Sequence, residues 1–163
     1  MPDAGEPHIR LKMRSQPRFL SGARAMICNV AQRIGFADAV GSKIALAVDE
    51  ALCNVIKHGY QRAPDGWIWM DLYVDDGESP SLTIVLEDRA SQIDPDQIRS
   101  RDLDDIRPGG LGVHIIKEIM DHVTYEKRDG GGMRLTMRKD LSAVPETVSE
   151  SVSSTTDKGT ADT

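Results

Sequence analysis

A glutamate, an asparagine and a lysine interrupt an otherwise apolar stretch, LAVDEALCNVIKHGY, at residues 46–60. If this stretch is a helix, Glu50 and Asn54 lie one above the other because they are four residues apart, and Lys57 falls on the same polar flank. A carboxylate and an amide placed in this way could act on one ligand. The alternative is an ordinary solvated flank of an amphipathic helix.

Two further segments carry groups that could join the first at one site. Asp88 directly follows an apolar strand, where its carboxylate could accept a hydrogen bond from an exocyclic amine such as that of adenine, or simply begin a turn. The sequence GGLG at residues 109–112 predicts free backbone N–H groups at a helix N-terminus, which binds anions, or a tight turn without a ligand. Each signal is weak alone.

Hydrophobic periodicity predicts the elements that must position these groups. The expected order is β-α-α-β-β-loop-α-β-β, with a long polar loop over residues 89–108 that has the features of a lid. The expected strands are 9–13, 67–74, 82–87, 123–127 and 133–139, and the expected helices begin at Pro17, before Ile44 and at Gly109. This order favours a two-layer α/β sandwich, in which one mixed, mostly antiparallel sheet carries about three helices on one face.

Length and composition favour one globular domain. The chain has 163 residues, of which 39% are hydrophobic and 28% charged, and no apolar run approaches the roughly 18 residues of a membrane span. We expect the domain at residues 8–139, a short extension at 1–7 and a disordered, acidic, Ser/Thr-rich tail at 140–163. The N-terminus lacks a signal-peptide pattern, so we expect a cytoplasmic protein.

The charge is unevenly distributed along the chain. The tail at 140–163 holds five acids against one lysine, so it accounts for −4 of the net charge of −6 and leaves the rest near neutral. Binding to nucleic acid without sequence preference depends on many phosphate contacts, so we expect no direct nucleic-acid partner.

Taken together, the three segments resemble the anti-sigma-factor serine/threonine protein kinases of bacteria, within the GHKL superfamily of histidine-kinase-like ATPases that share the Bergerat fold. The resemblance rests on DEALCNVIKHGY, LEDRASQIDP and GGLGVHIIKEIMDHVTYEKRDGGGMRLTMRK, and it covers about residues 8–139. It implies an ATP- and Mg²⁺-dependent kinase that phosphorylates a STAS-type anti-sigma-factor antagonist and also sequesters a sigma factor. By family habit the protein would be a homodimer.

The resemblance also implies roles for particular residues. Glu50 matches the general base, and Asn54 matches the ligand of Mg²⁺. Asp88 matches the residue that binds the adenine amine, and Gly110 and Gly112 match the glycines that close over the phosphates.

Three more residues complete the ATP-binding set that the resemblance implies. Thr136 matches a threonine near the adenine on the last strand, and Lys57 is placed beside the phosphate-binding residues. Ala90 stands where the family usually has glycine, and its methyl group could crowd the base.

Two other functions stay open at this point. The first is a module that binds a sigma factor or an antagonist and uses ATP only structurally, which Ala90 makes plausible. The second is an ATPase or a histidine kinase catalytic module, although the chain lacks both a separate helical phosphoacceptor domain and the second glycine of a DxGxG box.

Overall fold

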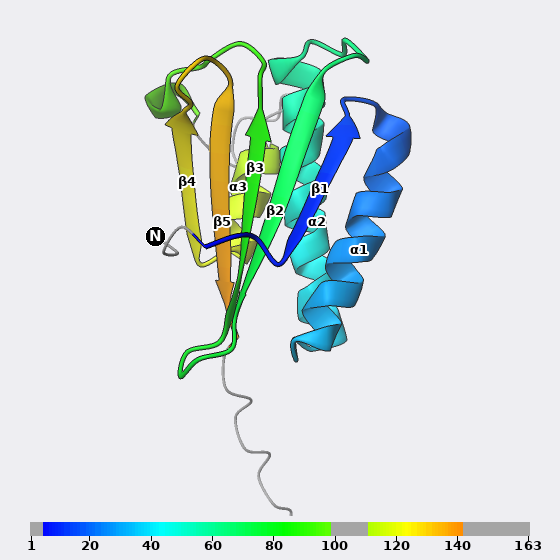
Figure 1. The fold of residues 1–163 in the computed structure, drawn as a ribbon, viewed down its shortest axis with the longest axis vertical. Helices are drawn as coiled ribbons and strands as arrows, with labels where there is room; N and C mark the ends of the chain where they lie inside the picture. The colour runs from blue at the N-terminus through cyan, green and yellow to red at the C-terminus, as the bar shows by residue number, and fades with distance from the viewer. Residues whose placement is uncertain (1–4, 99–110, 142–163) are drawn as a thin grey trace, which may run out of the picture.

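The computed structural model describes residues 5–98 and 111–141, and its strands form one open sheet in the order β1-β2-β3-β5-β4 (Figure 1). Every neighbouring pair is antiparallel. The sheet is therefore fully antiparallel, whereas a mixed, mostly antiparallel sheet was predicted. The strands are β1 (Ile9–Arg14), β2 (Trp67–Asp75), β3 (Ser81–Asp88), β4 (His122–Lys127) and β5 (Met133–Asp140).

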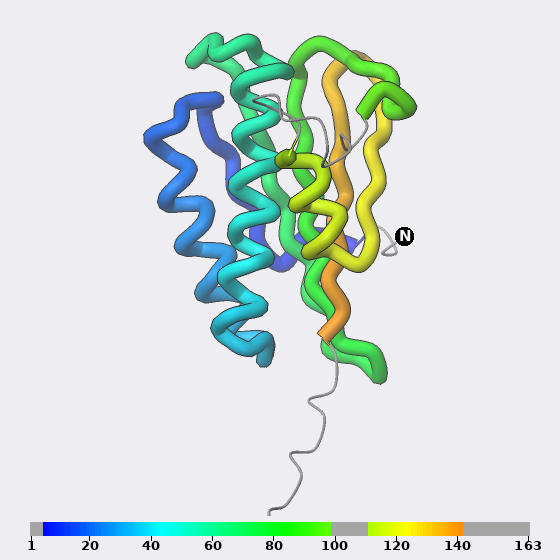
Figure 2. The backbone as a smooth tube through the Cα atoms, turned by 180° about the vertical axis from the view of Figure 1, so that it is seen from behind, coloured from blue at the N-terminus to red at the C-terminus, as the bar shows by residue number. Residues whose placement is uncertain are grey.

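Three α-helices cover one face of this sheet, as Figure 2 shows from behind. They are α1 (Leu20–Arg33), α2 (Asp38–Asn54) and α3 (Leu111–Ile119). Of the short helical turns, η1 (Pro17–Phe19) precedes α1, η2 (Val55–Gly59) follows α2, and η3 (Pro95–Gln97) lies between β3 and α3. The two-layer sandwich and the predicted order of elements are therefore confirmed. Within the described ranges, no helix combines the length and apolarity that crossing a bilayer requires.

The core lies between the sheet and α2. Alternate residues of β2 turn toward the helices, and Ile68 and Met70 are fully buried there. On α2, Ile44, Ala47 and Val48 are fully buried. The buried face of α2 is wide because α2 packs between α1 and α3 (Figure 2).

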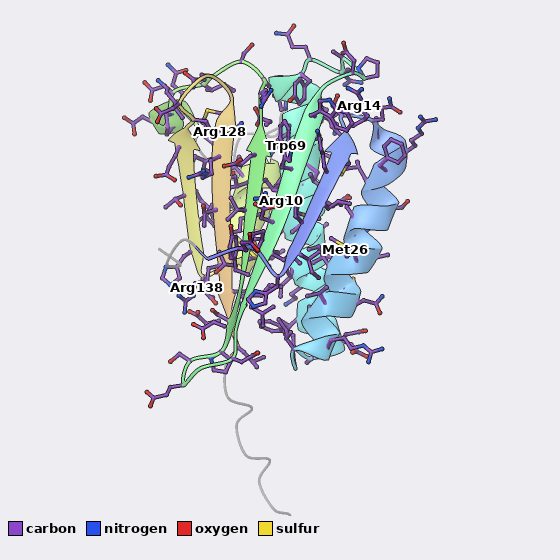
Figure 3. All side chains as sticks on the ribbon, in the orientation of Figure 1. Arg10, Arg14, Met26, Trp69, Arg128 and Arg138 are labelled. Atoms are coloured by element: carbon purple, nitrogen blue, oxygen red, sulfur yellow. The ribbon has the colours of Figure 1, made fainter. Side chains whose placement is uncertain are left out.

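No helix of the described residues covers the other face of the sheet, where cations gather around two tryptophans. Lys12 Nζ lies 4.3 Å from the centroid of the Trp67 ring, and the guanidinium of Arg14 lies 3.7 Å from it. Arg128 lies 5.9 Å from the ring of Trp69, and Figure 3 shows Arg14, Trp69 and Arg128 toward the same end of the sheet. This basic cluster was not visible in the sequence, because its residues are far apart along the chain and come together only when the strands pair.

Candidate functional site

A cavity of about 240 Å³ lies between the end of α2, the first turn of α3 and the ends of β3 and β5. Its wall is mostly apolar, with Leu86 and Leu135 among its residues, and Asn54, Asp88 and Gly112 also line it. A concave, largely apolar site with a few fixed polar groups is typical of small-molecule binding.

Asn54 and Gly112 line this cavity, and Glu50 lies beside them although it is not part of the cavity wall. A Cβ atom added to Gly112 would lie 2.8 Å from Glu50 Oε2 and 3.3 Å from Asn54 Nδ2. The first turn of α3 therefore contacts the polar flank of α2, and any larger residue at 112 would displace one of these side chains. Glu50 and Asn54 are both half-buried. They are therefore not ordinary solvated residues on the outer flank of an amphipathic helix.

Lys57 does not join this group. It is exposed and is not part of the cavity wall. The helical wheel placed it beside Glu50 and Asn54, but Val55–Gly59 is a turn of π-helix, in which i→i+5 hydrogen bonds change the angle between successive residues. The α-helical phase therefore does not continue past Asn54.

Asp88 is 4% exposed and lines the cavity at the end of β3. Its Oδ1 atom accepts hydrogen bonds from the backbone N–H groups of Ala90 (2.8 Å) and Met133 (3.2 Å). Burial raises the pKa of Asp88, and those two N–H donors and the positive charge of Arg128 only partly oppose this effect. Among the described residues Oδ2 accepts no hydrogen bond, so it can accept one from a ligand.

The turn between β4 and β5 holds Asp88 in place. Gly132, at φ +86°, packs against the backbone of Asp88 so closely that an added Cβ would lie 2.0 Å from the Asp88 carbonyl oxygen. Arg128 donates a hydrogen bond from Nη1 to the same oxygen. The side chain of Gln92 donates to the carbonyl oxygens of Arg128 (2.7 Å) and Gly132 (3.2 Å), so the segment after β3 is tied to this turn as well.

Thr136 lies on the wrong face of the sheet for the role assigned to it. Met133 and Leu135 line the cavity, whereas Thr136 is directed to the opposite face, where it pairs with Val85 and Thr124. The predicted contact of Thr136 with adenine is therefore wrong, and Met133 is the β5 residue next to Asp88.

Ala90 and Gly110 also belong to the predicted ATP-binding set. The methyl group of Ala90 points at Gly59, where an added Cβ would lie only 3.0 Å from it, and Ala90 is not part of the cavity wall. The crowding of a bound base by Ala90 stays a prediction, because Ala90 is not on the cavity wall but lies against Gly59, which is. Gly110 lies outside the described residues, as do positions 99–108 of the predicted lid.

Several wall residues were missed in the sequence. His58 lies on the wall, and because α-helical spacing ends at Asn54, no local spacing indicated its position. Ser91 and Gln97 also line the cavity, but nothing in their local pattern distinguishes them from other polar loop residues.

The donor groups fit Mg²⁺ held together with a nucleotide, rather than a metal ion enclosed by protein. Within residues 5–98 and 111–141 no group of three or more His, Cys, Asp or Glu side chains could hold a metal ion. Mg²⁺ typically takes one or two protein oxygens and completes its shell with water and phosphates. Asn54 offers such an oxygen at the cavity wall.

Comparison with known proteins agrees with this geometry. The sequence model of the histidine kinase-like ATPase domain family matches residues 13–139, and the chain therefore belongs to that family. The chain is 28% identical to the serine-protein kinase RsbW of Listeria innocua over 134 residues, which cover 78% of this chain and 85% of that protein. It is 25% identical to the serine-protein kinase RsbW of Bacillus subtilis, over 79% of this chain and 84% of the relative.

Among solved structures, the histidine kinase domain of a blue-light activated histidine kinase from Erythrobacter litoralis superposes with a TM-score of 0.45 at 18% identity. The match covers 76% of this chain and 59% of that one.

Proposed function

We propose that this protein is an ATP-dependent serine protein kinase and anti-sigma factor, which phosphorylates a STAS-type antagonist and sequesters a sigma factor. The observation that carries the proposal is that Asn54, Gly112 and the buried carboxylate of Asp88 line one cavity, with Glu50 next to Gly112. The relatives compared above are serine-protein kinases, which supports the same activity.

Each of these residues has a defined task in phosphoryl transfer from ATP. Asp88 accepts a hydrogen bond from the adenine amine through Oδ2, and the apolar wall excludes water from the base. The backbone at Gly112 faces the phosphates, and Glu50 accepts the proton of the attacking seryl hydroxyl. Mg²⁺, when bound, would neutralise phosphate charge, and Asn54 is the residue that would hold it.

The proposed setting is a cytoplasmic homodimer whose partners are proteins and not nucleic acid. The cations of the open sheet face do not favour nucleic acid as a partner, because carboxylates already pair with many of them. Arg10 lies 2.6 Å from Asp71, and both Arg128 and Arg134 form ion pairs with Glu87. These guanidinium groups are less available to phosphates than their number suggests.

The alternative of a binding module without transfer rested on crowding of the base by Ala90. Ala90 does not line the cavity itself, and its methyl group lies behind Gly59 of the cavity wall, so this alternative has only indirect support.

Binding of ATP with magnesium to the full chain is the first test. Nucleotide at 100 times its dissociation constant should raise the free energy of unfolding by about 2.7 kcal/mol, because only the folded chain binds it. Calorimetric titration gives the constant, and labelled γ-phosphate gives transfer to a co-purified antagonist. No heat of binding at millimolar nucleotide would remove the kinase and ATPase proposals together, whereas binding without transfer would leave the binding module.

Asp88→Asn should reduce the preference for ATP over GTP by about tenfold, a typical effect of one mismatched hydrogen bond in a buried site. The amide can present a donor to the adenine amine, which is itself a donor. The preference of the wild type should also fall as the pH is lowered through the raised pKa of Asp88, because protonation removes the charged acceptor, and Asp88→Asn should lack this pH dependence.

The preference is measured by competition between the two nucleotides at several pH values. Asp65→Asn is the matched control, since Asp65 is exposed in the loop before β2. An unchanged preference in Asp88→Asn would show that Asp88 does not read the base.

A further inference from the structure

A second groove, of about 410 Å³, lies on the helical side between α2 and α3, away from the candidate nucleotide site. Its floor is apolar, and Leu46 on its wall is 42% exposed, which is unusual for a large aliphatic side chain. The residues that line it are Val40, Lys43, Leu46, Ile115, Glu118, Ile119 and Lys139.

The described chain ends beside this groove. Lys139, near the end of β5, is part of the groove wall. Leu141 is held where its backbone N–H donates to Pro80 (2.8 Å), and its side chain lies 3.5 Å from the position of a Cβ on Gly35. Gly35 precedes α2 by only a few residues, so the tail starts near the first turns of α2, where the groove begins with Val40.

The tail carries a pattern that suits this groove. Val144, Val148 and Val152 are spaced four apart and would share one face of a helix. Pro145 is compatible with the first turn of such a helix. A helix over 144–152 would be about 13.5 Å long, and the α2 wall of the groove, from residue 40 to 46, is about 10.5 Å long at the same rise per residue.

Charge complements the apolar match. Glu146 and Glu150 flank the valines on the tail, and Lys43 on the rim has no ion pair within the described residues. Lys139 is already bound to Asp121, with 2.9 Å between Nζ and Oδ1, so Lys43 is the rim cation available to the tail. The acid on the rim, Glu118, is 73% exposed and faces His114.

We propose that residues 144–152 dock in the groove between α2 and α3 as a short amphipathic helix, with their valines against Leu46, Ile115 and Ile119. The docked segment is a latch across the two helices that carry Asn54 and Gly112. A segment of this composition does not fold alone, but covalent attachment gives it a millimolar effective concentration at the groove. This proposal replaces plain disorder for residues 144–152.

Hydrogen exchange of the full chain, followed by mass spectrometry, tests the latch. Amides of 148–152 should exchange at least about tenfold more slowly than in an unfolded peptide, because these are the N–H groups that bond within the helix. Val148→Glu in the tail and Leu46→Glu in the groove should each abolish this protection. Thr155→Glu, with the same charge change in the tail, and Phe19→Glu, at a position 41% exposed and outside the groove, should preserve it.

Three results would overturn the proposal. The first is exchange of the amides of 148–152 at the unfolded rate in the wild type. The second is protection that survives Leu46→Glu, since the segment would then be docked elsewhere. The third is protection that disappears on dilution, which would assign the groove to the tail of a second copy. None of these results depends on ATP binding or kinase activity, so the latch and the proposed function can fail separately.

Discussion

Replacing Glu50 with glutamine should lower phosphoryl transfer to the antagonist by about 10²- to 10⁴-fold, the usual loss when a positioned general base is removed. Folding and ATP binding should be retained, because the amide has the shape of the carboxylate and the side chain is only half-buried. Transfer of labelled γ-phosphate and a binding titration of the same preparation separate the two effects. Asn54→Ala should differ, because loss of the metal ligand weakens magnesium-dependent ATP affinity together with turnover.

Asp49→Asn is the matched control for Glu50→Gln. Asp49 is the adjacent carboxylate on α2, but it faces α1, where its Oδ2 lies 3.8 Å from Arg24 Nη1, and it is not part of the cavity wall. Its Oδ1 is buried without a hydrogen-bond partner within the described residues, and an amide there should leave transfer unchanged. Normal transfer in Glu50→Gln combined with loss in Asp49→Asn would make Asp49 the base.

Gly132→Ala should cost at least about 3 kcal/mol in the free energy of unfolding, one of the largest losses expected from adding a methyl group. The added Cβ would lie 2.0 Å from the Asp88 carbonyl oxygen, so β3 and the β4–β5 turn would have to separate. The substitution also places alanine at φ +86°, which alone costs about 1–2 kcal/mol.

Gly130→Ala isolates the cost of the backbone angle. Gly130 has φ +83°, and an added Cβ there meets no described atom within 4 Å, so only the loss of about 1–2 kcal/mol should appear. Urea unfolding of both variants, with a check that the slopes agree, measures the difference. Equal losses at the two positions would contradict the close approach of Gly132 to Asp88.

Local patterns in the sequence were enough to determine the elements and some of their functional residues. Apolar residues alternating along 67–74 predicted β2, and the period of α2 placed Glu50 above Asn54, because both depend only on the geometry of one element. Asp88 at the end of β3 was found in the same way. The resemblance to a family then linked three segments that no periodicity connects.

Only the tertiary structure decided which residues meet across elements. Gly112 contacts Glu50 because α3 packs on α2, and no spacing along the chain encodes that distance. Thr136 was assigned to the cavity through the family resemblance, and Met133 was not, because that match did not consider which face of the strand turns toward the helices. Pairing of β5 with β3 fixes that face, and residues an odd number apart lie on opposite sides of the sheet.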